Sequence, residues 1–181
     1  MNRHAFTLVE LLVVIAIIGL LSTVAVVAMA GSRIKARETK RMADVRQIIT
    51  AMQMYLDANG HYPDTGALGC AGGGSTSFCL GRGDSGTCWG SFGVHGCTAL
   101  DNALAPYMGK IPSDPKNDSS PCGDAYIYQY SGAISLGNDT PGVHWGTEQT
   151  SASASQYCLS GYSGQWGATC LNRYYCTLKL P

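Results

Sequence analysis

Eight cysteines are the residues with the most distinctive chemistry in this 181-residue chain. All of them follow residue 69, and they are Cys70, Cys79, Cys88, Cys97, Cys122, Cys158, Cys170 and Cys176. Their spacings lack the close CxxC pairs of zinc ribbons and thioredoxin-like sites. An even count in a loop-rich segment therefore predicts disulfides, with the pairing left open, and an oxidising, extracytoplasmic compartment. A thiolate-bound structural metal, or free thiols in a membrane-anchored redox enzyme, are the alternatives.

A single carboxylate, Glu10, stands inside an otherwise apolar N-terminal run. Residues 11–30 carry no charge, and a helix of about 20 apolar residues spans the ~30 Å hydrocarbon core of a bilayer. A carboxylate at that depth costs roughly 2.5–3.5 kcal/mol on insertion scales and usually has a partner. The pattern predicts a membrane helix in which Glu10 has a function. A removed secretory signal, or Glu10 lying at the membrane surface, are the alternatives.

The run AFTLVELLVVIAIIG, residues 5–19, resembles the N-terminus of type IV pilins and type II secretion pseudopilins. The similarity is dense over residues 5–30, weaker as far as Pro63 and faint beyond. In that family a prepilin peptidase cuts before the phenylalanine and methylates the new N-terminus. The resemblance implies cleavage between Ala5 and Phe6, N-methylation of Phe6, and pairing of Glu10 with the N-terminal amine of a neighbouring subunit.

A second helical segment follows the apolar one, because residues 33–58 contain neither Gly nor Pro. Its apolar residues recur every three or four positions, as in an amphipathic helix. They are Met42, Val45, Ile48, Ile49, Met52, Tyr55 and Leu56. Asn59-Gly60 predicts the end of the helix. The two segments are expected to form one helix whose second half packs against the rest of the chain.

Charge is distributed unevenly, although the net charge is zero. Residues 33–46 hold six basic and two acidic residues, whereas residues 47–181 hold five basic and nine acidic ones. We expect one of two roles for the basic cluster. Either it is solvated beside lipid headgroups, or it attracts the acidic heads of adjacent subunits and so guides how the subunits dock. Nucleic acid is an unlikely partner, because the head is acidic and no aromatic residues are interleaved with the basic ones.

The remaining sequence predicts a small sheet. Residues 125–130 alternate and place three tyrosines on one face, and residues 173–180 are typical of a terminal strand. Residues 104–115 are interpreted as turn-rich. The expected fold is α+β: a long N-terminal helix, half transmembrane and half amphipathic, packed on a small antiparallel sheet with Gly/Cys-rich, disulfide-bonded loops.

These patterns and the resemblance together predict four segments. Residues 1–5 are the leader peptide, 6–32 the transmembrane and assembly helix, 33–60 the amphipathic helix, and 61–181 an extracytoplasmic Cys-rich globular head. The precursor is expected to cross the cytoplasmic membrane once, and the mature form to lie in a cell-surface or periplasmic filament.

No motif predicts catalysis or a cofactor, so we expect no enzyme. Asp114, Asp118 and Asp124 offer oxygen ligands for calcium, but their spacing does not fit an EF-hand. Arg82-Gly83-Asp84 is the cell-adhesion tripeptide, which glycine-rich loops also produce by chance. The four histidines show no spacing typical of a metal or catalytic site.

The resemblance implies that the chain is a structural subunit of a type IV pilus-like filament. Its expected partners are further copies of itself, the prepilin peptidase, the assembly machinery and the membrane. We favour a pilus over a type II secretion pseudopilus because a large cysteine-rich head suits a surface-exposed fibre. A minor tip pilin that binds a receptor or DNA is a further alternative.

Overall fold

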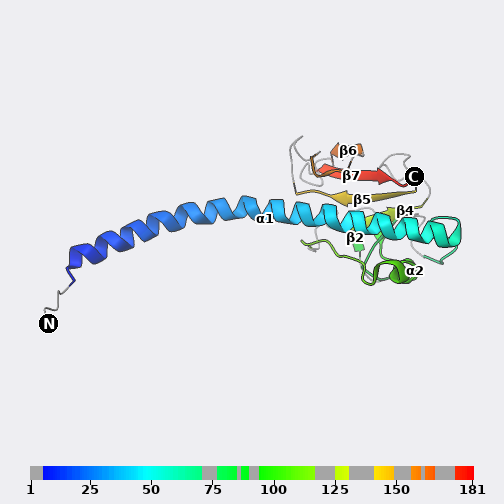
Figure 1. The fold of residues 1–181 in the computed structure, drawn as a ribbon, viewed down its shortest axis with the longest axis horizontal. Coiled ribbons are helices and arrows are strands. Elements are labelled where there is room, and N and C mark those ends of the chain that lie inside the picture. Colours follow the sequence, from blue (N-terminus) through cyan, green and yellow to red (C-terminus); the bar gives the residue numbers. More distant parts are fainter. Residues whose placement is uncertain are drawn as a thin grey trace. The chain divides into compact units, whose positions relative to one another are not determined.

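The computed structural model describes residues 6–70, 77–84, 87–89, 94–116, 125–130, 141–148, 156–159, 162–165 and 174–181. Contacts between residues divide the chain into two units, Met1–Ala36 and Arg37–Pro181. Helix α1 (Leu8–Asn59) contributes residues to both units (Figure 1). The helix ends where the sequence predicts, since Gly60 adopts a φ of 77° and its N–H bonds the Leu56 carbonyl.

In the N-terminal unit, the apolar side chains of α1 are exposed instead of packed. Leu8–Ala25 form an 18-residue stretch with a mean hydropathy of 2.6, long and apolar enough to cross a membrane. Phe6 and Leu8 are 78% and 79% exposed, which is unusual for such residues in water. This unit therefore buries its apolar surface only against something outside the single chain.

The second unit contains a five-stranded, fully antiparallel sheet in the order β1-β4-β5-β7-β6. Its strands are β1 (Ser77–Cys79), β4 (Tyr126–Gln129), β5 (Gly142–Gly146), β6 (Tyr162–Gln165) and β7 (Tyr174–Lys179). The short strands β2 (Thr87–Trp89) and β3 (Val94–His95) form a separate antiparallel pair. The α+β fold class and the terminal strand are therefore confirmed.

The core of this unit lies between α1, the sheet and helix α2 (Thr98–Met108). In the view of Figure 1, α2 and strands β5–β7 appear on opposite sides of α1. Val45, Ile48 and Met52 of the predicted apolar stripe are fully buried, and Ile49, Tyr55 and Leu56 pack at the edge of the core. The amphipathic assignment of this half of α1 is confirmed.

Strand β4 positions Tyr126 toward α1 and Tyr128 toward the segment that follows α1. The Tyr126 hydroxyl donates to Asp44 of α1 at 2.8 Å, and the Tyr128 hydroxyl donates to the Pro63 carbonyl at 2.9 Å. Burial and the Asp44 carboxylate raise the pKa of Tyr126 far above its ordinary value. The opposite face of β4 is covered as well, because Ile127 and Gln129 are also fully buried.

Helix α2 contradicts the turn-rich interpretation of residues 104–115, because residues 104–108 are helical. Leu100 and Leu104, one turn apart, are both fully buried, so the helix is stabilised by packing. Pro106 lies near the C-terminal end, and the Gly109 N–H bonds the Ala105 carbonyl just beyond it. The prolines and glycine that suggested turns in fact surround the end of a helix.

Candidate functional site

The N-terminus of α1 is closed by a reciprocal pair of hydrogen bonds between Thr7 and Glu10. The Thr7 backbone N–H and hydroxyl both donate to Glu10 Oε2 at 2.8 Å, and the Glu10 N–H donates to Thr7 Oγ1 at 3.3 Å. This is a capping box, in which the two residues satisfy two donors that the first helical turn leaves unpaired. Thr7 is not among the functional residues predicted from the sequence, although its T-x-x-E spacing to Glu10 is the signal that reveals it.

Glu10 has no ionic partner among the described residues of the chain. Its side chain lies on an exposed, apolar stretch of α1 and accepts hydrogen bonds only from Thr7. A neutral capping residue does not cancel the carboxylate charge, so placing this segment in hydrocarbon leaves that charge uncompensated. Phe6 is exposed, and Ala5 lies outside the described residues. A cationic partner for Glu10 must therefore come from outside the described residues.

The basic cluster of α1 differs from both expectations, because its central member is buried in the head. The Arg41 side chain is 1% exposed. Its guanidinium donates two hydrogen bonds to Asp114, at 2.7 and 2.9 Å, and one to Glu148 at 3.0 Å. It also lies 3.2 Å from Glu38. Three carboxylates thus surround one cation inside the chain, so Arg41 neither contacts solvent nor meets another subunit.

Arg37 extends this charged cluster by one helical turn. Its guanidinium makes a bidentate pair with Glu148, with both distances 2.6 Å. Its hydrogen bonds to the Glu148 carboxylate raise the pKa of Arg37. Burial by itself would raise the pKa of Glu148, but Arg37 and Arg41 outweigh it and hold that pKa below 4.5. Glu148 therefore remains ionised and links β5 to two turns of α1.

Glu38, like Asp114, is a fully buried carboxylate of the cluster. Its side chain is fully buried, and its Oε1 accepts a hydrogen bond from the Glu148 N–H at 2.6 Å. Its Oε2 has no hydrogen-bond partner among the described residues. Burial is the main cause of a raised pKa at Glu38, which the nearby Arg41 partly opposes. A buried charge of this kind costs free energy, and the surrounding cations offset part of that cost.

The charged cluster is thus Arg37, Glu38, Arg41, Asp114 and Glu148, and its role in this structure is to fix loops to α1. Asp114 follows α2 and Glu148 follows β5, so each ion pair joins α1 to a segment far along the chain. Arg41 also lies four residues before Val45, on the same helical stripe. That periodicity was the available signal that Arg41 faces inward.

Two disulfides join described cysteines, so the prediction of disulfides is confirmed in kind. Cys70 bonds Cys97, and Cys158 bonds Cys176. Cys79 is disulfide-bonded as well. The side chains of the other three predicted cysteines, Cys88, Cys122 and Cys170, lie outside the part of the chain that the structure describes.

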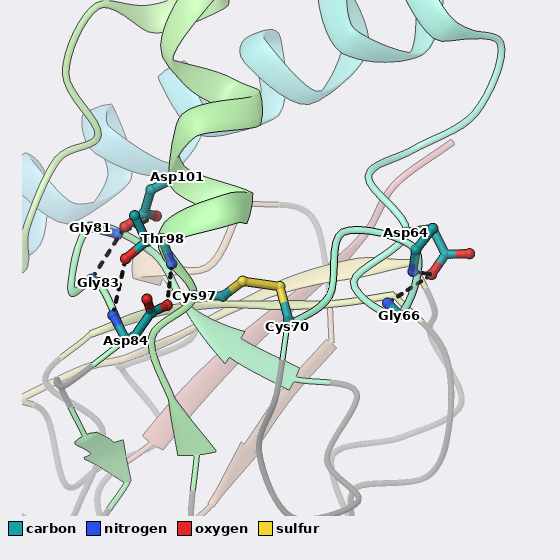
Figure 2. Close-up of a disulfide and its surroundings, with 10 residues drawn as sticks. Asp64, Gly66, Cys70, Gly81, Gly83, Asp84, Cys97, Thr98 and Asp101 are labelled. Atoms are coloured by element: carbon teal, nitrogen blue, oxygen red, sulfur yellow. Dashed lines mark hydrogen bonds between the residues drawn. A yellow bond between two sulfur atoms is a disulfide. The ribbon is translucent and has the colours of Figure 1, made fainter.

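Figure 2 shows the Cys70–Cys97 bond beside the N-terminus of α2. The Thr98 N–H donates to Asp84 at 2.7 Å, and the Asp84 N–H donates back to the Thr98 hydroxyl at 3.2 Å. The Asp101 carboxylate accepts hydrogen bonds from the N–H groups of Gly81 and Gly83. The aspartate of the Arg82-Gly83-Asp84 tripeptide therefore caps a helix, so its carboxylate is already engaged within the chain.

The calcium ligands considered from the sequence are not brought together by the described residues. Asp114 binds Arg41 through both carboxylate oxygens, while Asp118 and Asp124 lie outside the described ranges. Among the residues that the structure describes, no group of three or more His, Cys, Asp or Glu side chains is arranged to hold a metal ion.

Comparison with known proteins supports the N-terminal assignment. Residues 1–26 match the family model of the prokaryotic N-terminal methylation motif. The chain is also similar to three proteins named type II secretion system core protein G, from Escherichia coli (strain K12), Aeromonas hydrophila and Pectobacterium carotovorum subsp. carotovorum. They are 40%, 38% and 36% identical to it over 64 residues. No solved structure matches the chain.

The matched region covers 35% of this chain and 44%, 45% and 41% of those relatives, so less than half of each relative is spanned. Together with the exposed apolar helix, these matches support the resemblance of the N-terminal segment to type IV pilins and type II secretion pseudopilins. Its three named relatives are all components of type II secretion systems.

Proposed function

We propose that this chain is a structural subunit of a pilin-like filament. In this proposal a prepilin peptidase cleaves between Ala5 and Phe6 and methylates Phe6, and copies then polymerise through their N-terminal helices. The observation that carries the proposal is an exposed apolar helix with one carboxylate, Glu10, that lacks a cationic partner among the described residues. The match to the methylation motif covers this segment.

The chemistry of assembly follows from two costly charges. Cleavage creates an amine at Phe6, and hydrocarbon disfavours both that ammonium group and the Glu10 carboxylate. Bringing the amine of one subunit to Glu10 of the next offsets part of both costs, because opposite charges attract strongly at low dielectric. The capping box supports this role, since Thr7 holds the Glu10 carboxylate at the very end of the helix where a neighbouring amine would arrive.

Two observations support a location outside the cytoplasm. Disulfides form in oxidising compartments. In this head, Cys70 bonds Cys97 and Cys158 bonds Cys176. The apolar helix fits a membrane-anchored precursor. The head would then lie on the extracytoplasmic side, and the mature chain in a periplasmic or cell-surface filament.

The decisive variant is Glu10→Gln, which removes the charge while keeping the size of the side chain. We expect a stable, membrane-inserted precursor and a loss of filaments. Ser22→Ala is the matched control, because the Ser22 hydroxyl lies on the same exposed helix and bonds only the Ile18 carbonyl. Filaments should form normally with this control. A normal filament yield from Glu10→Gln would contradict the proposal.

A type II secretion pseudopilus is the second candidate, and the three core protein G relatives favour it. The two candidates share processing and polymerisation but differ in what a deletion does. Loss of the chain from a pseudopilus would stop the export of folded proteins, whereas loss from a pilus would remove surface fibres and leave export intact.

A further inference from the structure

One carboxylate of the head is not used within the chain. Asp57 lies in the last turns of α1 and is exposed, and its side chain makes no hydrogen bond or ion pair with a described residue. The other described aspartate and glutamate side chains of the head all have bonded partners. As far as the described side chains show, Asp57 is therefore the carboxylate that a partner outside the chain could bind.

An exposed apolar side chain lies beside this carboxylate. Met54 is 48% exposed, unlike the other large apolar side chains that the structure describes in the head. It precedes Asp57 by three residues, which places the two side chains about 60° apart around α1 and one turn apart along it. Thr50, a further turn back, is exposed as well. These three residues form the α1 patch, and an apolar group next to polar ones, with Met among the enriched residue types, is typical of protein interfaces.

The α1 patch lies on the side of the helix that is turned away from the core. At 100° per residue, Ile48 and Met52 lie about 180° and 140° around α1 from Asp57. Both of these residues are fully buried in the core of the head. The chain therefore covers the inner side of α1 and leaves the patch accessible to another molecule.

A cation without a partner among the described residues lies on the opposite side of the head. Lys179 of β7 is exposed, and its ammonium group makes no hydrogen bond or ion pair with a described residue. Successive side chains of a strand point to opposite faces of the sheet. Cys176 and Leu180 belong to the core between the sheet and α1, so Lys179 lies on the other face of the sheet. Helix α1, the core and the sheet thus separate Asp57 from Lys179 within one copy.

Asp57 and Lys179 nevertheless lie at the same end of the head. The Pro181 carbonyl, two residues beyond Lys179, accepts a hydrogen bond from the Tyr62 hydroxyl at 3.1 Å. Tyr62 in turn follows the end of α1 at Asn59 by three residues. Two parallel heads that lie side by side can therefore bring the α1 patch of one copy to Lys179 of the other with little displacement along α1.

We propose that Asp57 of one copy binds Lys179 of a second, parallel copy of this chain. This inference rests on the proposed function and names the surfaces through which neighbouring heads contact each other in the filament. Met54 then packs against the aliphatic stem of the same lysine, because long charged side chains lay their stems on apolar surface and keep the charge at the polar end.

The contact is of the kind that propagates. Its two halves lie on opposite sides of one subunit, so each copy uses Asp57 toward one neighbour and Lys179 toward the other. Such a contact is heterologous, and it builds an open filament unless its rotation closes a ring. Arg46 cannot replace Lys179 in this role, because it lies only about 20° around α1 from Asp57 and so shares the face of the carboxylate.

The test is a charge exchange in cells whose only copy of the gene carries the variant. Asp57→Lys and Lys179→Asp should each lower the sedimentable filament fraction about tenfold or more, because like charges then face each other at every contact. The double variant restores opposite charges and should recover most of the wild-type yield. Lys110→Glu is the matched control and should assemble normally, since Lys110 is an exposed lysine after α2 without a bonded partner among the described side chains.

Thermal unfolding of each full-length variant in detergent shows whether its head is intact. Should a charge reversal lower the melting temperature, Asp57→Asn and Lys179→Gln take its place. These neutral variants remove the attraction without adding repulsion, so each should lower the filament yield about twofold to fivefold.

The outcomes separate this inference from the function on which it rests. Full assembly of both single variants, with Glu10→Gln still failing to assemble, overturns the pairing of Asp57 with Lys179 and leaves the filament subunit standing. Failure of the folded double variant to recover also overturns the pairing, and would assign the α1 patch to a different partner. A loss from Lys110→Glu as large as that from Lys179→Asp overturns it too, because net charge alone then explains the yield. Absence of filaments from the wild-type chain overturns the proposed function and the pairing together.

Discussion

The two units of this chain handle apolar and charged groups in opposite ways. In the described part of the N-terminal unit, large apolar side chains are exposed, and side-chain hydrogen bonds such as those at Glu10, Ser22 and Arg33 join residues only three or four positions apart. In the head, apolar side chains are buried, and Arg41 reaches across 73 and 107 residues to Asp114 and Glu148. The head pairs Arg37 and Arg41 with its own carboxylates. The N-terminal helix depends on a membrane or on other copies.

This contrast changes the interpretation of the basic cluster on α1. A row of cations just after a membrane segment suggests contact with lipids or with other subunits, yet Arg37 and Arg41 are bound within the head. Interaction between copies is therefore expected from Glu10 of the first unit, whose carboxylate has no ionic partner among the described residues.

The largest effect on the stability of the head is expected from Arg41→Met, which tests whether the head depends on its internal ion pairs. It leaves Glu38, Asp114 and Glu148 buried without their shared cation, and loss of one member of a buried ionic group costs about 3–5 kcal/mol. Denaturant unfolding of the full chain in detergent should show a clearly lower midpoint. An unchanged midpoint would mean that the head does not depend on its internal ion pairs.

A smaller effect concerns pH. Because the pKa of Glu148 is lowered in the folded head, its pairing stabilises the fold above pH 4.5, and this stabilisation is lost as the pH falls through the folded pKa. The melting temperature should decrease on acidification below about pH 4.5. Glu148→Gln should melt lower at neutral pH and show a shallower decrease.

Glu38 changes the pH dependence of stability in the opposite direction, so its contribution must be measured separately from that of Glu148. Burial raises its pKa, so its charge destabilises the fold at neutral pH, and protonation relieves that cost as the pH falls through its folded pKa. Glu38→Gln should therefore steepen the net loss of stability on acidification. An acid profile identical in wild type and Glu148→Gln would show that Glu148 is not the titrating partner.

The smallest effect, and the control for Arg41, is expected from Lys40→Ala. Lys40 pairs with Asp44 at 2.8 Å one turn along α1, but its side chain is 53% exposed. Such pairs contribute about 0.3–0.5 kcal/mol, and Asp44 keeps its hydrogen bond from Tyr126. A loss of stability comparable to that of Arg41→Met would show that exposed and buried ion pairs of the head contribute alike.

The sequence revealed what is local and periodic. The apolar run, the stripe at Val45, Ile48 and Met52, and the terminal strand all follow from spacing alone, and the structure contains each of them. Helix α2 was missed because its proline suggested a turn, while the packing of Leu100 and Leu104 decides the conformation.

No local sequence pattern indicates the partners of Arg41. Asp114 and Glu148 lie in separate loops, and only the folded sheet brings them to the same turn of α1. The short strands β1, β2 and β3 were missed for a related reason. Two or three residues carry too little alternation to reveal a strand, so pairing with neighbouring strands determines them.

The central claim is that the N-terminal helix is processed and then completed by other copies. Mass spectrometry of the protein purified from cells tests it most directly. The account predicts a chain that begins at Phe6, carries one added methyl group at its amine, and lacks residues 1–5. A chain that still begins at Met1, recovered in water without lipid or detergent, would contradict it.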